Sequence, residues 1–179
     1  MANFWYGLAV QEFAAGSINW GSNTIKVALV SALYSPSQNT DQYYSVAVSS
    51  GIVAAGVTLA TKTNVLGKLS AANTTWSSVT GSQVTQLVGY VDGNSPGTND
   101  YILFNLSSGT NLPVTPNGGN ITASWDPTNG IGTLFAGLSA GDKTALGKLR
   151  DWFRDVLKNP ARRDEQSGLW LPEPTLTLG

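Results

Sequence analysis

The feature that most constrains this fold is a series of short segments rich in β-branched and apolar residues, each bounded by Gly, Asn, Ser, Thr or Pro. Several short strands at such spacing indicate a sandwich or a barrel rather than βαβ units. Residues 24–31 alternate most clearly. The other predicted strands are residues 56–62, 64–69, 74–79, 84–91, 101–106, 120–125 and 132–136. The sequence therefore predicts a mainly β fold, an antiparallel β-sandwich of the jelly-roll or immunoglobulin-like type.

A short N-terminal helix is expected ahead of the first of these strands. Residues 4–15 place Phe4, Leu8 and Phe13 at steps that bring apolar side chains to one side of a helix. We therefore expect one helix inside the β-body, with these three residues on its buried side.

The distribution of charge divides the chain into two parts. Charged residues are 12% of the sequence, against a usual share of about 25%. Every Arg, and more than half of all charged residues, follow Leu138. This change in character predicts a β-body at residues 1–137 and a C-terminal extension at residues 138–179.

The extension is predicted to open with a helix and to end in an extended arm. Ser139 is a suitable N-cap, and Asn159-Pro160 ends the helix. Between them, apolar residues recur at three- and four-residue steps, and the charged residues fall largely on the other side. Residues 169–179 carry Trp170 and two prolines, which is typical of an extended arm.

The apolar side chains of this extension are the predicted partner-binding residues. A single domain has little reason to keep an apolar arm unless something receives it. The helix can bury its apolar stripe against the body or against another subunit, and the sequence favours neither. The predicted partner-binding residues are Leu146, Leu149, Trp152, Phe153, Leu157, Leu169, Trp170 and Leu171.

Two residue types are missing from the composition, and their absence excludes much of enzyme chemistry. The chain has 0 Cys and 0 His, so it has no thiolate nucleophile, no Ser-His-Asp triad and no Cys- or His-ligated zinc. Its net charge of −1 gives no electrostatic reason to bind nucleic acid. No window approaches the roughly 18 apolar residues of a membrane span. We therefore expect no catalytic residues, no cofactor, no metal site, and no nucleic-acid or membrane partner.

Three groups of residues could carry chemistry, and a structural role is favoured for each. Asp92, Asn94, Thr98 and Asp100 could surround a Ca²⁺ ion, but their spacing is not that of an EF-hand, and a hairpin loop is favoured. The acids of the body could supply a pair for glycoside hydrolysis, although no spacing nominates one. The Trp residues could stack on sugars, whereas in a β-sandwich Trp more often closes the core or an interface.

Segments of the body resemble a known family. Residues 16–30 read GSINWGSNTIKVALV, residues 74–81 read TTWSSVTG, and residues 112–126 read LPVTPNGGNITASWD. With these motifs the chain resembles a family of small virion proteins of tailed bacteriophages over roughly residues 1–135. The extension after Gly137 is not part of the family's usual pattern.

The resemblance implies a structural role in the virion, because members of this family are head decoration (cement) proteins or minor structural proteins. It implies a capsid decoration protein on the head surface that binds the major capsid protein and stabilises the DNA-filled head. A homo-oligomer is expected, with a trimer favoured. The alternatives are a structural protein of the neck, tail or fibre attachment, and a host-glycan-binding module. An enzyme is the weakest alternative, because the chain offers neither His nor an acid pair.

Overall fold

The computed structural model describes residues 3–65, 67–93, 100–128 and 130–133, all of which belong to one compact unit, Met1–Leu134. The predicted extension at residues 138–179, with its helix and arm, lies outside the described residues. The predicted partner-binding residues that lie there are Leu146, Leu149, Trp152, Phe153, Leu157, Leu169, Trp170 and Leu171. Their role stays a prediction.

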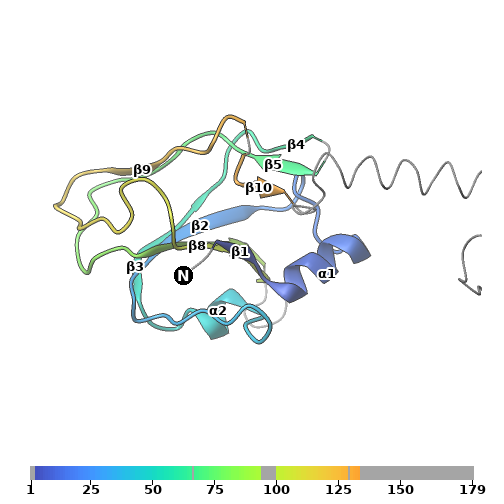
Figure 1. The fold of residues 1–179 in the computed structure, drawn as a ribbon, viewed down its shortest axis with the longest axis horizontal. Coiled ribbons are helices and arrows are strands. Elements are labelled where there is room, and N and C mark those ends of the chain that lie inside the picture. Colours follow the sequence, from blue (N-terminus) through green and yellow to red (C-terminus); the bar gives the residue numbers. More distant parts are fainter. Residues whose placement is uncertain (1–2, 66, 94–99, 129, 134–179) are drawn as a thin grey trace, which may run out of the picture. The chain divides into compact units, whose positions relative to one another are not determined.

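A five-stranded antiparallel sheet runs through the middle of the described part (Figure 1). Its strands, in spatial order, are β1 (Phe4–Trp5), β8 (Ile102–Leu106), β7 (Gln86–Val91), β2 (Ile25–Val30) and β3 (Ile52–Thr58). β2 and β7 are inner strands with neighbours on both sides, and most of their side chains are buried on both faces. This burial explains why these two segments read as nearly unbroken apolar runs.

Two smaller antiparallel sheets complete the β structure. One contains β10 (Gly132–Thr133), β5 (Lys68–Ser70) and β4 (Thr63–Val65) in that spatial order. The other, called the ribbon below, pairs β6 (Thr74–Trp76) with β9 (Ile121–Ala123). The predicted mainly β class with antiparallel sheets is confirmed.

Two helices lie on one side of the five-stranded sheet, and the ribbon strand β9 with β4, β5 and β10 lies on the other (Figure 1). The helices are α1 (Gly7–Ala15) and α2 (Tyr44–Ala47). Gly16 caps the end of α1, and its φ of 79°, which is favourable for glycine, lets the next N–H, that of Ser17, bond back to the Glu12 carbonyl at 3.0 Å.

Indole N–H groups connect the small sheets to the rest of the fold. Trp76 Nε1 donates to the Ala55 carbonyl of β3 at 3.2 Å. Trp20 Nε1 donates to the Ser70 carbonyl of β5, also at 3.2 Å. Both rings are buried, so each combines a large apolar contact with a satisfied donor.

The start of the chain differs from the expected helix over residues 4–15. Phe4 and Trp5 form β1 and pair with Asn105 and Phe104 of β8, so the helix begins only at Gly7. The prediction was wrong for these two residues because their pairing with β8 outweighs local helical periodicity. The buried position of α1 is Ala9, rather than the larger residues of the predicted stripe.

Other elements also differ from the sequence prediction. The single strand predicted at residues 64–69 is instead two paired strands, β4 and β5, because a turn divides the segment. β3 begins at Ile52, ahead of the predicted start at residue 56. α2 was not predicted, because a helix of 4 residues is too short to show a period.

Candidate functional site

An open groove of about 750 Å³ lies between the five-stranded sheet and the ribbon. This volume is within the range of about 300–1,000 Å³ that is usual for ligand sites. Its walls come from β2, β7 and β8 on one side and from β6 and β9 on the other. The apolar lining residues are Leu29, Trp76, Val84, Leu87, Leu106, Leu112, Val114, Ile121, Ala123, Trp125 and Ile131.

A row of three leucines on neighbouring strands forms the floor of the groove. Leu29 of β2 is paired with Leu87 of β7, and Leu87 is paired with Leu106 of β8. Residues paired in this way point to the same face of a sheet. Leu29 is buried, whereas Leu87 and Leu106 are only half-buried. The floor therefore keeps apolar surface open near the centre of the sheet.

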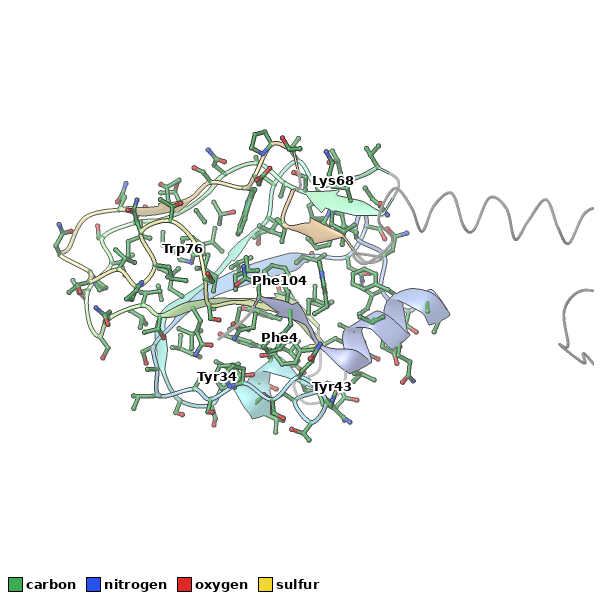
Figure 2. All side chains as sticks on the ribbon, in the orientation of Figure 1. Phe4, Tyr34, Tyr43, Lys68, Trp76 and Phe104 are labelled. Atoms are coloured by element: carbon green, nitrogen blue, oxygen red, sulfur yellow. The ribbon has the colours of Figure 1, made fainter. Side chains whose placement is uncertain are left out.

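The ribbon forms the opposite wall. Trp76 is paired with Ile121, so both side chains are on one face of the ribbon. Figure 2 shows Trp76 in the space between the ribbon and the sheet, where its ring is tied to β3 by the hydrogen bond to Ala55. At the alternate positions of the two ribbon strands, Thr75 and Thr122 are paired, and their exposed hydroxyl groups are 2.8 Å apart.

The rim of the groove is held by side-chain to backbone hydrogen bonds. Asn3 Oδ1 accepts from the N–H groups of Ser107 and Ser108, each at 2.9 Å, and Asn3 Nδ2 donates to the Ser108 carbonyl at 3.0 Å. Trp125 Nε1 donates to the Ala72 carbonyl at 3.0 Å. Among the described residues that line the groove, Asp126 is the only charged one. The lining thus combines apolar side chains with uncharged polar ones and carries little charge.

The candidate ion-binding loop is described only at its two ends. Asp92 Oδ2 lies 2.7 Å from Lys26 Nζ. Asp100 Oδ2 accepts from the backbone N–H of Ser45 at 2.6 Å. These contacts give both carboxylates structural partners. The candidate ligands Asn94 and Thr98 lie outside the described residues.

Another carboxylate of the body ends a chain of buried hydroxyl groups. Asp41 Oδ2 accepts from Tyr34 OH at 2.7 Å and from the Ser37 N–H at 2.8 Å. Because the single hydroxyl proton of Tyr34 goes to Asp41, Tyr6 OH is the donor in its 2.7 Å bond to Tyr34 OH. Burial raises the pKa of Tyr6 to about 12 and raises that of Tyr34 as well.

The described acids were compared with the grouping that a metal ion requires. Within residues 3–65, 67–93, 100–128 and 130–133 there is no group of three or more Asp or Glu residues that could hold a metal ion. In the same described ranges, no helix is long and apolar enough to cross a membrane.

The described Trp side chains serve mainly as anchors inside the protein. Trp20 and Trp76 are buried, and their indole N–H groups bond to backbone carbonyls. Trp5 packs edge-on against Phe104 with ring centroids 5.3 Å apart. Of these four residues, Trp76 and Trp125 line the groove, and Trp125 is half-buried there.

No family model, curated protein or solved structure matches this chain. The functional interpretation therefore rests on the groove itself. Its lining offers apolar contact beside uncharged polar side chains, which suits contact with a segment that is mainly apolar and carries few charges. Sequence reasoning missed the groove, since Leu87 and Leu106 have the pattern of ordinary inward-facing strand residues.

Proposed function

We propose that this chain is a structural protein of a bacteriophage virion, a capsid decoration (cement) protein that binds the major capsid protein on the head surface. The observation that carries the proposal is the nearly uncharged apolar groove between the sheet and the ribbon. An attachment protein needs such a surface, because exclusion of water from apolar contacts is the main favourable term in protein association. The resemblance of residues 16–30, 74–81 and 112–126 to small virion proteins supplies the biological setting.

The proposed mechanism is adhesion without turnover. A decoration protein that contacts two coat subunits adds contact area across their joint. Because these contacts exist only in the assembled shell, binding shifts the equilibrium toward that state by mass action. In this way the protein stabilises the DNA-filled head against internal pressure. No cofactor, metal or nucleic acid takes part.

The finer architecture and the oligomeric state belong to the same proposal. The ribbon facing the five-stranded sheet supports a β-sandwich of the jelly-roll or immunoglobulin-like type. A homo-oligomer, with a trimer favoured, suits a lattice with repeated symmetric positions.

The copy number of this chain in purified virions, relative to the major capsid protein, tests the proposal. Quantitative mass spectrometry is expected to give a ratio near one or a simple fraction such as one to three. About a dozen copies or fewer per particle would contradict capsid decoration and favour the neck, tail or fibre attachment. Absence from virions would contradict every structural role and leave host-glycan binding and, as the weaker alternative, an enzyme. A glycan-binding assay of the purified chain is then the next measurement.

A further inference from the structure

The groove leaves apolar side chains open where an inner strand normally has cover. Leu87 belongs to β7, which has a neighbour on each side, yet it is only half-buried because the ribbon does not close over it. Leu106 beside it is in the same situation. The described residues thus form a wall on each side of the groove and leave the space between them unfilled.

The shape and chemistry of the groove favour an extended apolar peptide. Its lining includes Asn3, the three leucines and Trp125, and much of it comes from β-strands. Extended peptides bind such surfaces by placing alternate side chains into the apolar lining. Among the described lining residues only Asp126 is charged, which favours an occupant with few charges over a highly charged one.

The chain itself contains a segment of this chemistry. Residues 169–178 read LWLPEPTLTL, with Glu173 as their one charged residue. Pro172 and Pro174 fix their own φ near −65° and disfavour helix in the residues before them. Leu176 and Leu178 alternate with threonines, which is the period of a strand. The remaining residues of the extension, from 139 to 168, carry most of its charge and do not match the groove.

The described part of the chain ends shortly after residues that line the groove. Thr133 is paired with Lys68 in β10, and Gly130 and Ile131, just before it, line the groove. The chain then continues to residue 179. The helix expected at residues 139–158 would by itself span about 30 Å, the diameter of a small domain. That length suits delivery of residues 169–178 to a neighbouring molecule.

We infer that the groove receives residues 169–178 of a second copy of this chain. Each copy then donates one arm and accepts another, so a closed ring such as a trimer leaves no groove empty. The inference deepens the proposed function, on which it depends for its setting in a virion. It names how neighbouring copies are joined.

Disulfide trapping of the full-length chain tests this exchange, and the absence of Cys from the sequence makes it a clean background. One population of chains carries Ser124→Cys, an exposed position in the lining, and another carries Thr175→Cys in the arm. The two are co-expressed, purified and mildly oxidised. A matched control replaces Ser124→Cys with Leu33→Cys, which is 74% exposed and does not line the groove.

The expected result is a two-chain product whose linked peptides, identified by mass spectrometry, join position 124 to position 175. The control pair should give much less of it. Lack of this link would overturn the inference. A one-chain product from the Ser124→Cys/Thr175→Cys double variant at high dilution would also overturn it, because the arm would then occupy its own groove.

A second measurement avoids any change to the β-body. Trp170→Ser/Leu171→Ser is expected to lower the oligomer mass of the full chain in light scattering, with unchanged thermal unfolding of the body. An unchanged oligomer mass would contradict arm exchange. These tests use the purified chain, whereas capsid decoration is tested by copy number in virions, so the two can fail separately.

Discussion

The ring of Phe104 lies directly over the α-carbon of Gly89, its cross-strand partner on β7. A methyl group at position 89 would collide with several atoms of that ring. Phe104 is 1% exposed, and Trp5 packs edge-on against it from β1. The ring therefore has no free space into which to move. Glycine at this position is what allows three neighbouring strands to pack around one aromatic side chain.

Gly89→Ala is expected to lower the free energy of unfolding by about 1–3 kcal/mol, the usual cost of overpacking a core. Urea denaturation of the two proteins measures the difference. Gly109→Ala is the matched control, because no atom lies within 4 Å of the added methyl group. Its effect should stay within about 0.5 kcal/mol. Equal effects of the two substitutions would contradict the close packing of Phe104.

Gln86→Leu is expected to destabilise the protein by about 2–4 kcal/mol, because buried polar groups lose their partners. Gln86 Nε2 donates to the carbonyls of Ser31 and Tyr34, at 3.1 and 2.8 Å. Gln86 Oε1 accepts from Asn105 Nδ2 at 2.6 Å. Denaturant unfolding monitored by Trp fluorescence provides the measurement.

Two comparisons sharpen the Gln86 prediction. Gln83→Leu makes the same chemical change at an exposed position and should be within about 0.5 kcal/mol of the wild type. Gln86→Leu/Asn105→Leu should cost less than the sum of the single variants, because the two amides are partners. Strict additivity would show that their hydrogen bond contributes nothing to stability.

Stability is expected to fall as the pH rises from about 10 to about 12. The pKa of Tyr6 is raised by burial from 10.0 to about 12, and burial also raises the pKa of Tyr34. The folded state therefore keeps protons that the unfolded state releases above pH 10, so the stabilisation is complete below pH 10 and is lost through this window.

Thermal unfolding at pH 8, 10 and 11, with tyrosinate absorbance as a second signal, measures the alkaline loss. Tyr6→Phe should make the decline above pH 10 shallower, because one group with a raised pKa is removed. A melting temperature that does not change between pH 10 and 11 in the wild type would contradict the buried hydroxyl chain.

Addition of Ca²⁺ or EDTA is expected to leave the melting temperature unchanged. Asp92 is paired with Lys26, and Asp100 accepts a backbone hydrogen bond from Ser45, so neither carboxylate needs an ion for compensation. The pair of Asp92 and Lys26 is partly exposed, and Asp92→Asn should cost about 0–1 kcal/mol. Differential scanning fluorimetry measures both effects. A rise in melting temperature with Ca²⁺ that Asp92→Asn abolishes would restore the ion-binding alternative.

The sequence determined the class of fold and the positions of most strands. Segments such as 24–31 and 84–91 can be recognised as strands from the sequence, because inner strands are buried on both faces and must be apolar along their length. Local pattern was not sufficient for β1, because Phe4 fits the apolar side of a helix but pairs with β8 in the folded protein. Periodicity indicates which face of a helix or strand is apolar, but it does not indicate which other element packs or pairs with it.

Only the tertiary structure decided where space is left and where it is filled. In the sequence alone, Gly89 looks like a residue that weakens its strand. The structure shows that the ring of Phe104 occupies the space a side chain there would need. Leu87 and Leu106 have the pattern of core residues in the sequence. In the structure the ribbon leaves both of them half-buried at the groove. Both outcomes depend on how segments far apart in the chain pack in three dimensions. Hydrophobic burial is non-directional, so a sequence specifies which residues avoid water more readily than which partner covers them.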